Sequence, residues 1–166
     1  MAGGELTLRR RALAVSDPLV HAGIAALVTA PLVPRAGAGP VLTAVAAGTL
    51  IDVDHPVAAR SLRLAASLSL PTRPRSHNAF TALGAAAVAT AAGGPLYGWA
   101  AFAGLASHLL HDSGDAAAAT PLLWPLAPPR QLGRRAQLAG TVALLAGSWL
   151  VSRASRASGA APPQTA

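Results

Sequence analysis

The chain has 166 residues, of which 52% are hydrophobic and 11% are charged, and its mean hydropathy is +0.45. This length excludes several independent domains, and this apolarity is untypical of a soluble enzyme. The sequence contains no cysteine, which excludes disulfides and thiolate ligands, so any metal ion must be held by nitrogen and oxygen atoms.

Three parts are predicted along the chain: a basic N-terminal segment (residues 1–16), a membrane-embedded helical domain (17–152) and a disordered tail (153–166). The N-terminal segment holds Arg9, Arg10 and Arg11, and its apolar stretch reaches Asp17 and Pro18 too soon for a cleavable signal peptide. Residues 157–166 are mainly Ala, Pro, Ser and Gln, which is typical of disorder.

Five apolar segments in the middle part predict helices: 19–33, 39–51, 79–92, 96–110 and 138–151. Each is shorter than the roughly 20 residues that cross a bilayer comfortably, so a crossing requires flanking residues to enter the membrane. The expected fold is an all-α, multi-pass transmembrane bundle of about four to five helices, with small residues that let helix backbones approach closely. The same segment lengths also fit a soluble bundle of buried, Ala-rich helices.

The basic residues predict an orientation, because positively charged loops stay in the cytoplasm. All 13 basic residues are Arg. Three groups of them, before the first apolar segment, between the second and third, and after the fourth, lie on the same side of the membrane if each segment crosses it. Arg153 and Arg156 conflict with a fifth crossing, so we expect four crossings, with the fifth segment interfacial or re-entrant. The predicted location is the bacterial cytoplasmic membrane, with lipids as partners. The net charge of +7 would also fit a nucleic-acid-binding protein. Because the Arg residues are grouped between apolar segments, we expect them to face a negatively charged membrane surface instead.

All five His residues, and five of the six acidic residues, lie at or near an end of an apolar segment. In the expected topology the ends that carry these His residues face the cytoplasm. Ionisable groups at membrane depth are costly unless they pair or bind ions, so the set predicts one site for a divalent metal ion. Its expected ligands are His21, Asp52, His55, His77, His108 and Asp112. The alternative is that these residues cap helices or lie among lipid headgroups.

Spacing supports the metal site. His108 and Asp112 are four residues apart and share a helical face, so they can bind one ion together, while His111 points elsewhere. Asp52 and Asp54 can project together if the chain is extended, one binding metal and the other orienting a His. A mixed set of His and carboxylate ligands suits zinc, manganese or iron(II), and an open coordination position would activate water.

Four runs occur in order along the chain: GTLIDVDHP at residues 48–56, HNAFT at 77–81, GLASHLLHD at 104–112 and PLLWP at 121–125. With His21, they make residues 17–125 similar to the YdjM-type family of small bacterial inner-membrane proteins, identified as metal-dependent hydrolases. The resemblance implies a multi-helix membrane domain and a site formed by His21, Asp52, Asp54, His55, His77, His108 and Asp112. The chain departs from the family pattern at Ile51, at Ala82, where the family has a second His, and at 113–119. We therefore expect one ligand to be absent.

Two functions follow. In the first, the protein hydrolyses an ester or phosphoester, with Asp54 or His111 moving protons and Arg73 and Arg75 holding a phosphate; a lipid headgroup is a fitting substrate at the membrane edge. In the second, the chain is a non-catalytic scaffold or regulator with a structural or decayed metal site, which Ala82 favours. Trp124 is expected either to anchor its loop at the membrane interface or to cover the site as a lid.

Overall fold

The computed structural model describes residues 8–114 and 118–157, and this part of the chain is all-α, as predicted. Five helices have 12 or more residues: α1 (Leu8–Thr29), α3 (Gly39–Leu50), α6 (Ala79–Gly93), α7 (Pro95–Asp112) and α8 (Arg134–Ala157). The shorter ones are η1 (Ala30–Leu32), α2 (Val33–Ala36), η2 (Ile51–Asp54), α4 (His55–Ala58) and α5 (Leu64–Ser67). Extended pairing among the described residues is limited to isolated bridges between loops.

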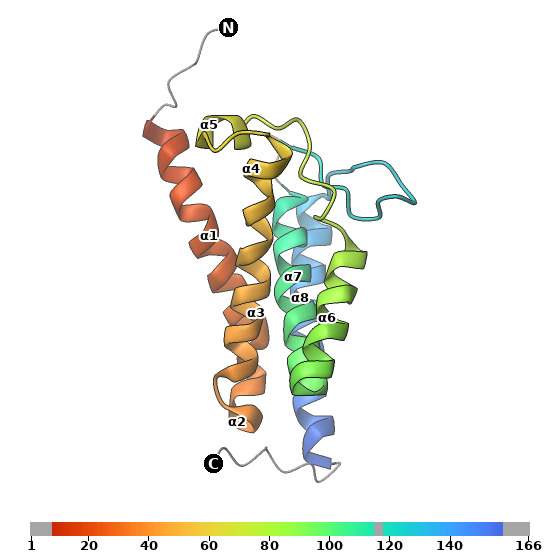
Figure 1. Cartoon of the computed structure of the whole chain (residues 1–166). Helices are drawn as coiled ribbons and strands as arrows, with labels where there is room; N and C mark the ends of the chain where they lie inside the picture. The colour runs from red at the N-terminus through yellow and green to blue at the C-terminus, as the bar shows by residue number, and fades with distance from the viewer. Residues whose placement is uncertain (1–7, 115–117, 158–166) are drawn as a thin grey trace, which may run out of the picture.

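The five long helices lie side by side and alternate in direction (Figure 1). The central helix is α7, which packs against each of the other four. One end of the bundle carries α4, α5 and the loops that lead into α6 and α8, and α1 begins there (Figure 1). The other end carries α2 and the last turns of α8. The first of these is called the loop-rich end below.

Local sequence sets where α6 and α7 meet. The side chain of Asn78 accepts a hydrogen bond from the Thr81 amide at 3.0 Å and caps the start of α6. Gly94 follows α6 with a φ of +88°, a conformation that favours glycine. Pro95 then begins α7, at a position where a missing N–H costs little. The uncharged residues 93–95 therefore form a tight turn at the end opposite the loop-rich end.

Small residues fill the centre of the bundle. Ala25, Ala44 and Ala100 are fully buried. Where α3 meets α7, a Cβ on Gly104 would overlap the backbone carbonyl of Ala44, and a Cβ on Gly48 would lie 2.9 Å from the Gly104 carbonyl oxygen. Such close approach of helix backbones is typical of small residues at helix contacts in membranes.

Many large apolar side chains point outward instead. Exposed examples occur on four of the five long helices: Leu19 and Leu27 on α1, Leu42 on α3, Leu83 and Val88 on α6, and Leu138, Val142 and Leu150 on α8. On the central helix α7, Leu96 is partly exposed. Two stretches, Ser16–Ala36 and Gly39–Ala58, are long and apolar enough to cross a membrane. Core helices of soluble proteins and signal sequences share this property, so the two stretches alone are weak evidence of a membrane protein.

The first helix begins earlier than the sequence predicts. α1 starts at Leu8 and continues through Pro18, so residues 8–16 of the basic segment belong to it. Proline removes one helix hydrogen bond and crowds the preceding turn, which is why the predicted apolar segment starts after Pro18. Packing of α1 on α3 and α7 offsets that cost.

The last helix also differs from the expectation. α8 lies alongside the other long helices and runs the length of the bundle without turning back, as a re-entrant segment would (Figure 1). Near its start, Gln137 donates to the Leu110 carbonyl at 2.7 Å, and near its end the Ser155 carbonyl accepts from Arg35 Nη2 at 3.2 Å. These contacts hold α8 at both ends of the bundle and keep residues 153–157 helical, although they fall in the predicted disordered tail. The rest of that tail, 158–166, lies outside the described residues.

Candidate metal centre

The loop-rich end brings together every side chain that the sequence assigns to the site. His21 comes from the second half of α1, Asp52 and Asp54 from η2, His55 from the start of α4, His77 from the loop before α6, and His108 and Asp112 from the last turns of α7. His21, His77, His108 and Asp112 are at most 1% exposed. Segments far apart in the sequence thus form one buried cluster of imidazoles and carboxylates.

The segment at residues 51–54 is a 3₁₀ turn rather than the extended chain considered for the Asp pair. A 3₁₀ turn has about three residues per turn, so residues three apart lie above one another. Asp52 and His55 therefore meet, with Asp52 Oδ1 3.4 Å from His55 Nδ1. The turn still presents both Asp52 and Asp54 to histidines, by a geometry that differs from the predicted one.

Asp112 lies at the centre of the cluster. Its Oδ2 is 3.2 Å from His108 Nε2 and 3.6 Å from His77 Nε2, and its Oδ1 is 3.6 Å from His21 Nε2. The contact with His108 follows from their spacing of four residues on one helical face, as the sequence predicts. The His21 and His108 rings stack with their centroids 3.8 Å apart.

Asp52 makes a second centre beside the first. Its Oδ1 lies 3.4 Å from His77 Nε2 and 3.5 Å from His108 Nε2, in addition to its contact with His55. Two groups of three result, His21–His108–Asp112 and Asp52–His55–His77, and within each group the ligand atoms lie within 4.8 Å of one another. Each group could hold a metal ion.

The donor atoms fit a cation. His108 Nδ1 lies 2.7 Å from the Gly48 carbonyl oxygen, which can only accept, so Nδ1 carries the proton and Nε2 directs a lone pair at Asp52 and Asp112. Both ring nitrogens of His21, Nε2 of His108 and Oδ2 of Asp112 are buried without a hydrogen-bond partner among the described residues. Because such groups are normally satisfied, a divalent cation such as zinc or manganese is suited to this set.

Asp54 lies on the outer side of the cluster. Its Oδ2 accepts a hydrogen bond from the Ser76 hydroxyl and is 3.6 Å from His77 Nδ1, while its Oδ1 is 3.3 Å from His55 Nδ1. Burial opposes a charge on His77, but contacts with the Asp52 and Asp54 carboxylates outweigh it and raise the pKa of His77 to about 9. A carboxylate behind a histidine is the usual arrangement that orients a metal ligand.

Two residues that the sequence does not assign as ligands or catalysts also contact the cluster. Asp17 Oδ1 is 3.6 Å from His21 Nε2 and 3.7 Å from His111 Nε2, which makes Asp17–His21–His111 a third group of possible ligands. Arg73, expected to hold a phosphate, has Nη2 3.1 Å from Asp112 Oδ1 and Nη1 3.4 Å from His55 Nε2. The spacing of Asp17 and His21, four residues apart, is a signal in the sequence that could have identified Asp17.

His111 faces a small polar cavity rather than the centre of the cluster. This cavity of about 270 Å³ is lined by Asp17, Arg73, His111, Gly114 and Gln137. The side chains of His111 and Asp17 are each 40% exposed. The cavity therefore gives the buried cluster a route to solvent that passes Asp17, Arg73 and His111.

Position 82 is not part of the cluster. Ala82 is buried against Leu105 and Leu109 and lines a larger, apolar cavity. The groups of three possible ligands are complete without a side chain from that position. Trp124, in the last of the four runs, is 38% exposed, and the Arg75 guanidinium lies 5.2 Å from the centre of its ring.

Comparisons with protein-family models, curated proteins and solved structures gave no match to this chain. The interpretation of the cluster therefore depends on its own geometry.

Proposed function

We propose that this chain is a multi-pass protein of the bacterial cytoplasmic membrane and a metal-dependent hydrolase that acts on an ester or phosphoester. The observation that carries the proposal is the buried cluster with Asp52 and Asp112 at its centre. Its imidazole nitrogens lie 3.2–3.6 Å from carboxylate oxygens, and several of these atoms have no hydrogen-bond partner among the described residues. A purely structural core rarely buries so many unsatisfied polar atoms.

The distribution of apolar side chains supports the membrane. Alanine is the most frequent buried apolar residue, while many Leu and Val side chains are exposed on α1, α3, α6 and α8. Large exposed apolar surfaces are rare on soluble monomers, and close contacts between glycines replace the large apolar core of a soluble bundle. Together with the two stretches long enough to cross, this arrangement favours a bundle surrounded by lipid.

The arginines support an orientation with the site in the cytoplasm. Ten lie in the loops and helix starts of the loop-rich end: Arg9, Arg10, Arg11, Arg60, Arg63, Arg73, Arg75, Arg130, Arg134 and Arg135. The opposite end carries Arg35, Arg153 and Arg156. Because positive charge is retained on the cytoplasmic side, the loop-rich end, and the metal centre with it, is assigned there.

The side chains around the cluster suit hydrolysis. A bound zinc or manganese ion would supply a nucleophilic water at neutral pH and polarise the substrate. Asp54 keeps His77 oriented, and the pair of Asp17 and His111 stands at the polar cavity, where it can accept and release protons. Arg73 faces the same cavity and can bind the anionic group of a substrate.

These assignments agree with what the resemblance to the YdjM-type family implies, and we propose membership of that family. The arrangement around Ala82 weakens the expectation of a missing ligand, because the cluster offers complete groups of three elsewhere.

A second function, a non-catalytic protein with a structural site, is favoured by one contact. Arg73 Nη2 lies 3.1 Å from Asp112 Oδ1 and neutralises part of the charge without a metal ion. In that case the cluster is a buried ion-pair network that fixes the packing of α1, α3 and α7.

The test is metal analysis of the detergent-purified protein, with hydrolysis of nitrophenyl esters, phosphomonoesters and phosphodiesters measured after loading with zinc or manganese. The proposal requires bound metal and turnover of at least one substrate, with both reduced in Asp52→Ala and His77→Ala variants that retain their helices. Bound metal without turnover of any substrate in the panel supports the structural role. Absence of metal in the loaded protein refutes the hydrolase and supports the metal-free ion-pair network.

A further inference from the structure

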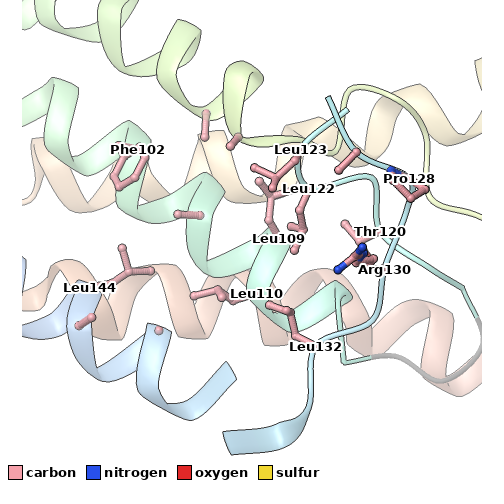
Figure 2. A pocket seen from close by; sticks show the side chains of 16 residues that line it. Phe102, Leu109, Leu110, Thr120, Leu122, Leu123, Pro128, Arg130, Leu132 and Leu144 are labelled. Carbon is pink, nitrogen blue, oxygen red and sulfur yellow. The ribbon is translucent and has the colours of Figure 1, made fainter. Parts of the chain in front are cut away.

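A second, larger cavity lies between α6, α7, α8 and the loop at residues 118–132. Its volume is about 720 Å³, which falls within the roughly 300–1,000 Å³ of small-molecule sites. Figure 2 shows that Phe102, Leu109, Leu122 and Leu144 line it, and nearly all of the other lining side chains are apolar too. The cavity therefore fits an apolar ligand or the apolar part of one.

The cavity does not belong to the metal centre. None of the cluster's His or Asp side chains lines it, and Leu110, which lines it, follows His108 by about 200° around α7 and so faces away from the cluster. Gly140, Ala143 and Leu144 of α8 form another part of the wall, and Leu110 packs against Gly140. Exposed apolar side chains of α8, including Leu138 and Val142, surround this wall on the outside.

One end of the cavity is polar. Thr120 is fully buried and lines it, and its hydroxyl has no hydrogen-bond partner among the described residues. Arg130 lies beside Thr120 (Figure 2), held there by backbone hydrogen bonds between the two residues at 3.0 and 3.1 Å. No described carboxylate forms an ion pair with Arg130, because the four acidic residues in the described part gather at the metal centre. A donor hydroxyl and a guanidinium at the end of an apolar cavity match an anionic headgroup with a hydrocarbon chain.

The polar end is joined directly to the metal-centre segments. The Arg73 amide donates to the Ala119 carbonyl at 3.0 Å, one residue before Thr120. The Leu132 amide donates to the carbonyl of Ser113 at 2.6 Å, one residue after Asp112. A headgroup at Thr120 and Arg130 would thus lie at the loop-rich end, at the level of lipid headgroups if the bundle crosses a membrane.

We infer that the large cavity is a binding site for one acyl chain of an anionic phospholipid, whose phosphate is bound by Arg130 and the Thr120 hydroxyl. The chain lies between α7 and α8, with its methyl end near Phe102 and Leu144. The site takes its ligand laterally from the membrane and needs no metal ion, so it is independent of the proposed hydrolase activity.

The test uses the full chain in amphipol, free of detergent that would compete, in metal-loaded and metal-free form. The probe is lysophosphatidic acid with a photoreactive diazirine in its acyl chain, and labelled residues are mapped by mass spectrometry. Labels are expected on cavity-lining residues of α7 and α8 in both forms. In Ala143→Phe, which fills the cavity, labelling of these residues should fall at least about ten-fold, whereas Ala146→Phe, on the same helix but outside the lining, should leave it unchanged.

The headgroup contact is tested with Arg130→Gln. Loss of one charge-assisted contact should weaken binding of lysophosphatidic acid about ten-fold and change binding of lysophosphatidylcholine of equal chain length much less. Labels that map only outside the cavity, or that persist unchanged in Ala143→Phe, overturn the site. Mapping in the unmodified protein decides the matter even if the Phe variant fails to fold. Equal affinity of Arg130→Gln and unmodified protein for both probes overturns the assignment of the phosphate.

Discussion

The decisive perturbation of the metal centre is Asp112→Asn, which keeps the volume of the side chain and removes its charge. The carboxylate is 1% exposed and lies within 3.6 Å of His21, His77 and His108. At about 4 Å and an effective dielectric constant of about 20, one pair of unit charges contributes about 4 kcal/mol. Loss of the charge should therefore weaken binding of a divalent ion by about a thousand-fold or more.

The matched comparison is His111→Gln, on the same helix one residue away. His111 contacts Asp17 and the polar cavity rather than the two central carboxylates, so its replacement should cost about ten- to a hundred-fold in affinity, as for residues that act through a ligand. The assay is metal content by mass spectrometry and affinity by competition with a chelating dye, with circular dichroism to establish that both variants retain their helices. Near wild-type metal content in the folded Asp112 variant would remove His108 and Asp112 from the site and refute the reasoning.

Four further predictions concern helix packing, the titration of His77 and the orientation in the membrane. Gly104→Ala should lower the melting temperature and cost about 1–3 kcal/mol of the free energy of unfolding, because the new Cβ meets the Ala44 carbonyl. The control is Gly84→Ala, where an added Cβ has nothing within 4 Å and the melting temperature should not fall. Equal melting temperatures of the two variants would contradict the close helix contact. Metal affinity, measured by titration between pH 6.5 and 9.5, should rise with pH, because the raised pKa of His77, about 9, means that a proton must leave before metal binds. The metal-free protein should show the opposite trend and lose stability as pH rises through about 9, since the protonated His77 stabilises it; pH-independent melting would count against the shift. In this cysteine-free chain, Ser69→Cys should react with a membrane-impermeant thiol reagent only in inverted vesicles and Ala92→Cys only in intact cells, and the reverse pattern would overturn the orientation.

Periodicity and spacing predicted much of the fold. The five apolar segments correspond to the five long helices, and the turn at residues 93–95 falls where Gly and Pro place it. The errors in the helix boundaries came from tertiary contacts. Packing keeps α1 helical through Pro18, and contacts with α2 and α7 extend α8 beyond its apolar stretch. Neither effect can be seen in local composition.

The histidines and central carboxylates were also predictable, because their helix ends share one side of the bundle. Asp17 escaped because it precedes the first apolar segment, although it shares a helical face with His21. The contact of Arg73 with Asp112 depends on how the loop before α6 folds back over α7, and no spacing along the chain encodes that. Thr120 and Arg130 likewise meet through a pairing between two loop segments.

The contact between His108 and the Gly48 carbonyl affects how this protein can change by mutation. In many metal sites the group that orients a histidine is a carboxylate, which one substitution deletes. Here the acceptor is a backbone oxygen near the end of α3. The last carbonyls of a helix lack partners within the helix and can accept hydrogen bonds from other groups. No side-chain replacement at residue 48 removes it directly; only a wider separation of α3 and α7 does. The tautomer of a buried histidine thus depends on the close helix contact at Gly48 and Gly104. Substitutions at these two positions would harm the site, although neither position carries a functional group.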